Sequence, residues 1–171
     1  MEKPTEAEFA PSYARYVALV PETDILEVLE QQVEETRRLA ASVPRERETF
    51  RYAEGKWSIR EVFGHLVDGE RVFGYRAFCI GRGEAAALPS FDENEYVAAA
   101  SSDAIPLAEL ADELALVRRS NLVALGRLGP SDWARVGTAS GKPVSVRALA
   151  WVMAGHLRHH FEILRERYGL R

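Results

Sequence analysis

Apolar residues recur every three or four positions in four stretches of the chain, each about 20 residues long. In the first stretch, residues 24–43, the apolar positions are Ile25, Leu29, Val33 and Leu39. This spacing places them on one face of an α-helix. Asp24 and Glu27 have the spacing of a capping box at its start, and Pro44 follows its end.

The same period predicts three more helices, over residues 59–81, 106–128 and 146–168. Ser58 and Glu61 form the capping-box pattern S-x-x-E in front of the helix at 59–81. Pro106 suits the first turn of the next helix, and Ser145 suits the N-cap of the last. Each predicted helix therefore has a start signal next to its apolar stripe.

The connections between these helices contain little regular structure. Residues 88–105 read as a loop with one short helix from about Asp92, and residues 136–146 could form a small hairpin. Four amphipathic helices without a convincing run of strands predict an all-α, up-down four-helix bundle. The length of 171 residues suits one domain that spans residues 1–171. Long connections in a compact domain are often functional, so these two could form one end of a pocket.

Composition and charge exclude several classes of function. The formal net charge of −4 provides no basic surface for nucleic acid, and no apolar run approaches the roughly 18 residues of a membrane helix. Residues 1–17 lack the apolar core of a secretory signal. The single cysteine, Cys79, cannot form an internal disulfide and fits a reducing compartment. We therefore expect a cytoplasmic protein whose partners are neither nucleic acid nor membrane.

Three of the four histidines lie in AGHLRHHFEIL, residues 154–164. On a helical wheel His156 falls at the centre of the apolar stripe, His160 lies inside it one turn later, and His159 lies at its edge. Each buried imidazole needs partners for two ring nitrogens, and an unpaired buried polar group costs about 1–3 kcal/mol. Either the two buried rings are core histidines satisfied by hydrogen bonds, or they bind one metal ion at i, i+4 spacing.

The fourth histidine, His65, lies at the border of the buried face of the helix predicted at 59–81. If that helix neighbours the last one, His65 completes a set of three imidazoles. Such a set suits zinc, nickel, copper or iron and leaves a coordination position open, as in catalytic sites. Asp68, one turn after His65, could orient an imidazole or act as a base, but a surface carboxylate paired with arginine fits equally well.

A few other side chains invite a functional interpretation. Arg71 and Arg76 are candidates for pairing with a substrate carboxylate, although a solvated helix face is the favoured interpretation. Cys79 fits a small core residue better than a catalytic thiol. Trp57 suits a staple-like contact at the start of its helix. Trp151 lies off the apolar stripe, which indicates either a dimer interface or a loop that packs over it.

Three segments together resemble the DinB-like superfamily of damage-inducible, metal-binding proteins. They are GKWSIREVFGHLVDGERVFGYRAFCIGRGE, LPSFDENEYV and VSVRALAWVMAGHLRHHFEILRERYG, and the likeness extends from about residue 22 to residue 169. The superfamily pattern has one histidine in GHLxD and a pair in HxxxH. In this sequence the pattern falls on His65, His156 and His160.

The resemblance implies an up-down bundle that binds a divalent metal, often zinc or nickel, and that is often a homodimer. Similar proteins include transferases that use low-molecular-weight thiols such as bacillithiol or mycothiol, a thiol-dependent isomerase, and metal-dependent hydrolases. The leading hypothesis is a metal-dependent S-transferase whose substrates are a small thiol and an electrophile. A metal-dependent hydrolase, a binding module without turnover and a member that holds no metal are the alternatives.

Overall fold

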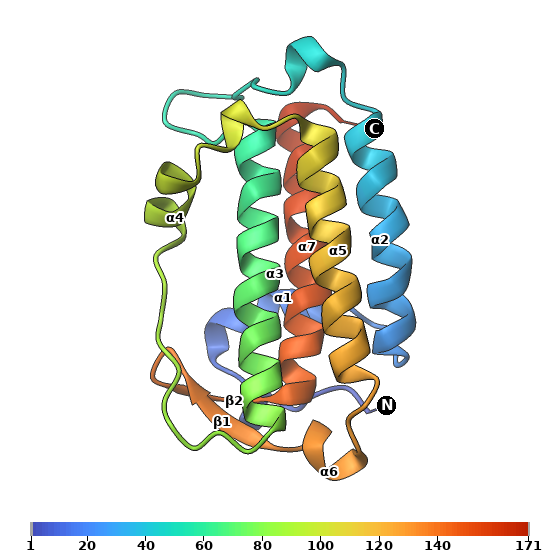
Figure 1. The fold of residues 1–171 in the computed structure, drawn as a ribbon, viewed down its shortest axis with the longest axis vertical. Helices are drawn as coiled ribbons and strands as arrows, with labels where there is room; N and C mark the ends of the chain where they lie inside the picture. Colours follow the sequence, from blue (N-terminus) through green and yellow to red (C-terminus); the bar gives the residue numbers. More distant parts are fainter. Residues whose placement is uncertain (1, 171) are drawn as a thin grey trace.

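The computed structural model describes residues 2–170. Four long helices form a bundle (Figure 1), and they are α2 (Ile25–Ala41), α3 (Ile59–Gly81), α5 (Leu107–Leu125) and α7 (Val146–Tyr168). The shorter elements are α1 (Ala14–Ala18), α4 (Glu93–Ala100), α6 (Pro130–Trp133) and the antiparallel strands β1 (Val136–Ala139) and β2 (Lys142–Ser145). None of the described helices is long and apolar enough to cross a membrane. The four-helix bundle expected from the sequence is thus confirmed.

The helices begin where the capping patterns predict. Ser58 Oγ accepts a hydrogen bond from the Glu61 backbone N–H at 3.0 Å, and Glu61 Oε2 accepts one from the Ser58 N–H at 2.7 Å. Asp24 Oδ1 accepts from the backbone N–H of Glu27 at 3.2 Å. These bonds satisfy N–H groups that a helix start leaves without partners. The caps therefore fix the first turns of α2 and α3.

The connectivity of the bundle brings α3 against α7. Helix α3 packs between α5 and α7, and α2 contacts the same two helices from the other side. Helices α2 and α7 run in one direction, and α3 and α5 run in the other (Figure 1). The long connection 82–106 returns the chain to the end of the bundle at which α3 begins. Helix α5 therefore starts at the same end as α3 and runs parallel to it. The order is up, down, down, up, which differs from the strict alternation of an up-down bundle.

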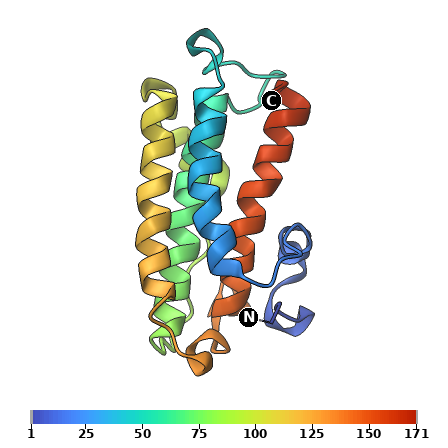
Figure 2. The same ribbon diagram turned by 90° about the vertical axis from the view of Figure 1, so that its right-hand side faces the viewer.

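The N-terminal segment covers the outer face of α7 (Figure 2). Val17, Val20 and Trp151 belong to one buried cluster, and Trp151 is 0% exposed. A segment far away in sequence therefore packs over Trp151, as one of the two alternatives for this residue expected, and leaves it buried. Gly155 permits the close approach, since a Cβ at this position would lie 2.0 Å from the Tyr16 carbonyl oxygen.

Glu8 fastens the N-terminal segment to the start of α7. Its carboxylate accepts hydrogen bonds from Arg147 Nε at 2.7 Å, Arg147 Nη2 at 2.8 Å and Ser145 Oγ at 2.8 Å. Burial raises the pKa of Glu8, but the hydrogen bonds from Arg147, Thr5 and Ser145 outweigh it and lower the pKa from 4.5 to about 2. The charged form of Glu8 thus stabilises the folded state.

We expect Glu8→Gln to lower the free energy of unfolding by about 1.5–3 kcal/mol near neutral pH, as for hydrogen bonds to charged groups. The pKa of Glu8 is lower in the folded state, so the unfolded state binds more protons between pH 4.5 and about 2. The contribution is fully present above pH 4.5 and is lost as the pH falls towards 2. Urea unfolding of both proteins tests this, and a difference that stays constant on acidification would contradict it.

Candidate metal centre

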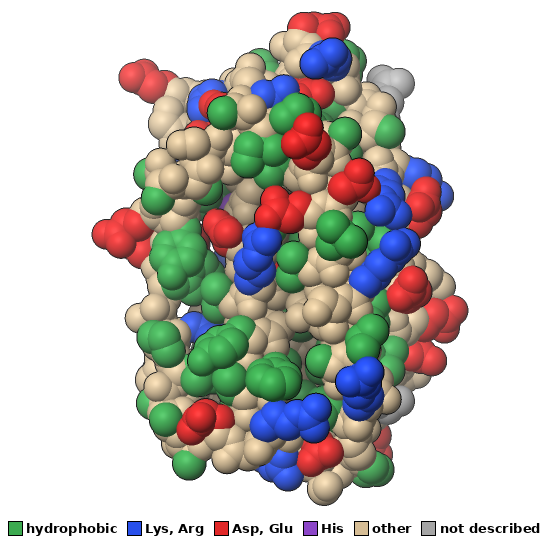
Figure 3. All heavy atoms as spheres, in the orientation of Figure 1, with side chains coloured by type: hydrophobic (Ala, Val, Ile, Leu, Met, Phe, Trp, Pro, Cys, Tyr) green, Lys and Arg blue, Asp and Glu red, His purple; other side chains and the backbone are tan. Residues whose placement is uncertain are grey.

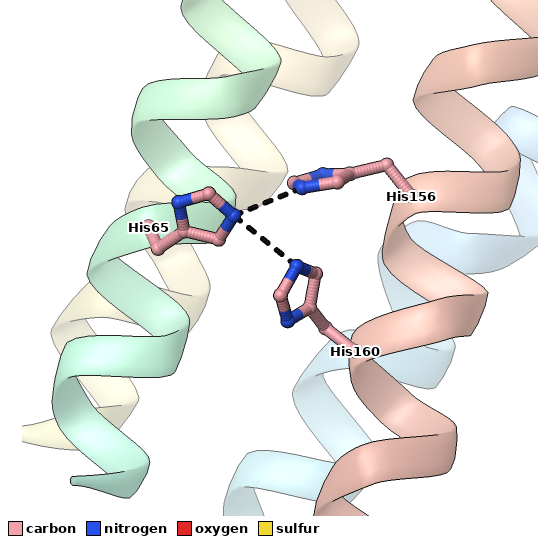
Figure 4. A group of neighbouring side chains, drawn as sticks. All are labelled: His65, His156 and His160. Atoms are coloured by element: carbon pink, nitrogen blue, oxygen red, sulfur yellow. Dashed lines mark hydrogen bonds between the residues drawn. The ribbon is translucent and has the colours of Figure 1, made fainter. Parts of the chain in front are cut away.

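Three histidines from two helices meet in the space between α3 and α7 (Figure 4). The Nε2 atom of His65 lies 2.9 Å from Nε2 of His156 and 3.1 Å from Nε2 of His160. His156 and His160 are one turn apart on α7, so their rings project from the same face. All three side chains are buried, with 4% to 8% of their surface exposed. The structure therefore brings together the three residues of the sequence pattern.

Hydrogen bonds alone cannot satisfy this arrangement of nitrogens. The Nε2 atom of a neutral imidazole carries either one N–H or one lone pair. His65 Nε2 can therefore pair with only one of its two neighbours, and a third nitrogen stays without a partner in this cluster. A tetrahedral ion with bonds of about 2.0–2.1 Å would hold donor atoms about 3.3 Å apart, close to the observed distances. The donor set fits a borderline divalent ion such as zinc or nickel.

The surroundings keep the three imidazoles neutral. Burial lowers the pKa of His65 to about 4, and the nearby His159 adds to this shift. Burial also lowers the pKa values of His156 and His160 well below 6.5, and the neighbouring histidines act in the same direction. The rings are therefore uncharged near neutral pH, which is the form that binds a metal.

Aromatic side chains hold the imidazole rings in place. The ring centroid of Trp57 lies 4.8 Å from that of His65, and the same indole stacks on His160 at 6.5 Å. Tyr16 meets His156 edge-on at 5.4 Å. Trp57 thus covers the centre in addition to flanking the start of α3. The sequence gives no sign of the role of Tyr16, because it lies 140 residues before His156.

A cavity of about 210 Å³ opens beside His160. It is lined in addition by Tyr52, Gly55, Lys56, Trp57, Val62, Ile163 and Tyr168. Most of these residues come from the connection between α2 and α3, whereas the sequence directs attention to the two longer connections. The cavity therefore lets a small molecule reach His160, the one histidine of the cluster that lines it, beside the rings of Tyr52, Trp57 and Tyr168.

Asp68 is not part of the three-histidine cluster. It lines a different cavity, with Gly64, Val67 and Ser102. Within residues 2–170, its carboxylate accepts no hydrogen bond from the three imidazoles. Burial raises the pKa of Asp68. No hydrogen bond in residues 2–170 supports the expected role of Asp68 in orienting His65.

His159 lies next to the cluster but outside it. Its ring centroid is 5.5 Å from Tyr16 and 5.2 Å from His160, and it is not among the residues whose donor atoms converge. This matches its position at the edge of the stripe on the helical wheel. His159 is consequently a natural control for substitutions of the other two histidines on α7.

A four-helix bundle with three buried histidines between two of its helices defines a class of protein with a candidate metal centre. The sequence pattern of the DinB superfamily matches residues 28–164. The chain belongs to the DinB superfamily. No protein with a curated description matches it in sequence.

Solved structures share the fold at low sequence identity. YfiT from Bacillus subtilis, described as a probable metal-dependent hydrolase with an unusual four-helix bundle topology, has a TM-score of 0.77 and 17% identity, covering 99% of this chain and 95% of YfiT. The mycothiol-dependent maleylpyruvate isomerase has a TM-score of 0.64 and 17% identity, over 83% of this chain and 60% of the isomerase. The DinB-like protein YjoA from Bacillus subtilis has a TM-score of 0.58 and 21% identity, over 83% of this chain and 87% of YjoA. These likenesses concern the fold.

Proposed function

We propose that the protein is a metal-dependent enzyme that transfers a small thiol to an electrophile. His65, His156 and His160 would hold a divalent ion, zinc or nickel. The observation that carries this proposal is the convergence of three buried Nε2 atoms, two of them 2.9 Å and 3.1 Å from the third. Three protein donors leave one position of a tetrahedral ion open. A divalent ion lowers the pKa of a thiol or water that binds there, so that the nucleophile is available near neutral pH.

The neighbourhood of the centre favours a thiol over water as the nucleophile. Within residues 2–170, no carboxylate or cysteine sulfur lies within 4.8 Å of all three Nε2 atoms. Both a thiol and a water release a proton when they become the nucleophile. Hydrolysis of an ester or amide needs, in addition, a group that returns a proton to the leaving group, whereas displacement of chloride by a thiolate does not. Cys79 follows His65 by 14 residues, roughly 21 Å along the helix axis, so the thiol would enter as a substrate.

The cavity beside His160 suits the electrophile. The rings of Tyr52, Trp57 and Tyr168 provide apolar walls, and Lys56 adds a positive charge on the same lining. An aromatic electrophile would therefore pack between these rings, with its reacting carbon directed towards His160. Binding in this position would also exclude water from the three nitrogens.

Single-turnover assays test this proposal. The thiols are cysteine, glutathione, bacillithiol and mycothiol, each with one chlorinated aromatic electrophile. We expect the wild type and His159→Ala to accelerate transfer with at least one thiol, and His160→Ala to lose that acceleration. Equal rates for the wild type and His160→Ala with every thiol would refute thiol transfer. Metal-dependent ester hydrolysis would then favour a hydrolase, and no metal-dependent reaction would favour a binding module.

Gly69 offers a way to weaken the centre without removing a ligand. A Cβ at Gly69 would lie 2.9 Å from Cε1 of His156, too close for an undisturbed ring. We expect Gly69→Ala to lower zinc affinity by about 10–100-fold, as for other residues that position a ligand. Gly64→Ala is the matched control, because its Cβ would meet Ser102 Oγ instead. Competition titration with a chelator measures both affinities, and unchanged affinity in Gly69→Ala would show that His156 tolerates displacement.

A further inference from the structure

Arg76 of α3 carries a buried positive charge that no carboxylate of residues 2–170 neutralises. Its side chain is 2% exposed, so the sequence-based preference for a solvated Arg76 is wrong. Nη1 donates to Tyr13 Oη at 3.2 Å, and Nη2 donates to the Pro89 carbonyl oxygen at 2.7 Å and to Ser140 Oγ at 2.9 Å. All three acceptors are neutral, and Arg76 forms no ion pair within residues 2–170.

A second deeply buried arginine, Arg118, has the carboxylate partner that Arg76 lacks. Arg118 donates from Nε and Nη2 to the two carboxylate oxygens of Glu70, both at 2.8 Å. Burial of a charge is costly unless an opposite charge and hydrogen bonds compensate it. Arg76 uses three of the five N–H donors of a guanidinium on neutral acceptors. It therefore retains both an uncompensated charge and donor capacity for an anionic ligand.

Arg76 lines a cavity of about 280 Å³ at one side of α3. Its other walls include Val72, Tyr75, Leu88, Phe91 and Tyr96, which come from α3, α4 and the connection between them. The guanidinium carbon lies 5.9 Å from the ring centroid of Phe91, and Phe91 lies 5.2 Å from Tyr96. Figure 3 shows hydrophobic side chains gathered on this face of the molecule, and Tyr75 and Tyr96 are exposed.

This cavity is separate from the metal centre. Arg76 follows His65 by 11 residues on the same helix, roughly 16 Å along its axis. The two cavities have no lining residue in common. A ligand can therefore occupy the Arg76 cavity whether or not the three histidines hold an ion.

We propose that the Arg76 cavity binds an organic carboxylate with an aromatic or apolar body. The carboxylate would accept charge-assisted hydrogen bonds from Arg76, which supplies the missing counter-charge. The body would pack between the rings of Tyr75, Phe91 and Tyr96. A purely structural role for Arg76, in which it only joins Tyr13, Pro89 and Ser140, predicts no carboxylate binding and is the alternative that the experiment separates.

Calorimetric titration of the full chain tests this proposal with three carboxylates: phenylacetate, 3-phenylpropionate and hexanoate. We expect at least one of them to saturate with a Kd of about 1 mM or lower, and the neutral 2-phenylethanol to bind at least about tenfold more weakly. Arg76→Gln should lower the carboxylate affinity by at least about tenfold. Arg82→Gln removes the same charge from an exposed position at the end of α3 and should leave the affinity unchanged.

A second variant keeps the test decisive if Arg76→Gln does not fold. Val72 is partly exposed at the cavity wall, and Val72→Phe should fill the cavity and abolish binding while Arg76 stays in place. Wild-type affinity in Val72→Phe, or in a folded Arg76→Gln, would overturn the proposal. So would equal binding of 2-phenylethanol, an equal loss in Arg82→Gln, or no saturation by any carboxylate below about 10 mM.

Discussion

His156→Ala should abolish the binding of a divalent ion, whereas His159→Ala should leave it intact. His156 is buried and directs Nε2 towards His65, so its loss leaves two donors and an open space between α3 and α7. We expect the affinity for zinc or nickel to fall by more than about 100-fold, beyond the usual effect of a residue that only supports a ligand. Elemental analysis after dialysis against each metal gives the number of ions per chain.

Thermal unfolding provides an independent measure of the same change. An ion that binds only the folded state at 100 times its Kd stabilises that state by about 2.7 kcal/mol. Chelation should therefore lower the melting temperature of the wild type and of His159→Ala, and should have no effect on His156→Ala. A His156→Ala protein that retains one ion per chain would refute the assignment of this residue as a ligand.

The second large effect concerns the buried ion pair in the middle of the bundle. Arg118 of α5 pairs with Glu70 of α3, and its Nη1 also donates to Gln32 Oε1 of α2 at 2.7 Å. Gln32 in turn donates to the carbonyl oxygen of Ala154 in α7 at 3.0 Å. One network thus joins all four long helices. Arg118→Met should lower the free energy of unfolding by about 3–5 kcal/mol, because it leaves the Glu70 carboxylate buried without its counter-charge.

Arg37→Met is the control for the loss of an arginine. Arg37 also joins α2 to α5, through an exposed pair with Asp112 at 2.9 Å. Exposed pairs contribute about 0–1 kcal/mol, so this variant should unfold almost as the wild type does. Urea unfolding of the metal-free proteins, followed by circular dichroism, compares the two. A loss in Arg118→Met no larger than that in Arg37→Met would contradict the importance of the network.

The long helices and the three histidines could be predicted from the sequence because both depend on local spacing. The apolar period and the caps at Asp24 and Ser58 gave the helix boundaries to within a few residues. His156 and His160 share a face because they are four residues apart on one helix. Only the contact between His65 and this pair required knowledge of which helices are neighbours.

What the sequence could not provide depends on contacts between distant segments. The wheel for α7 assumes one buried face, but α3 covers one side of this helix and the N-terminal segment covers another, so Trp151 is buried. Arginine is usually a surface residue, so the sequence predicts an exposed Arg76. Its burial depends on contacts with Tyr13, Pro89 and Ser140, which lie in three separate segments. The parallel arrangement of α3 and α5 likewise depends on how residues 82–106 cross the bundle.

Anomalous diffraction at the zinc absorption edge, from crystals grown with zinc, tests the central claim most directly. The proposed centre predicts a single strong peak between α3 and α7, about 2.0–2.1 Å from the Nε2 atoms of His65, His156 and His160. A density peak at that place would show the ion, its three ligands and the side on which a substrate can approach. The absence of a peak among these three nitrogens, in a protein saturated with zinc, would contradict the proposed metal centre.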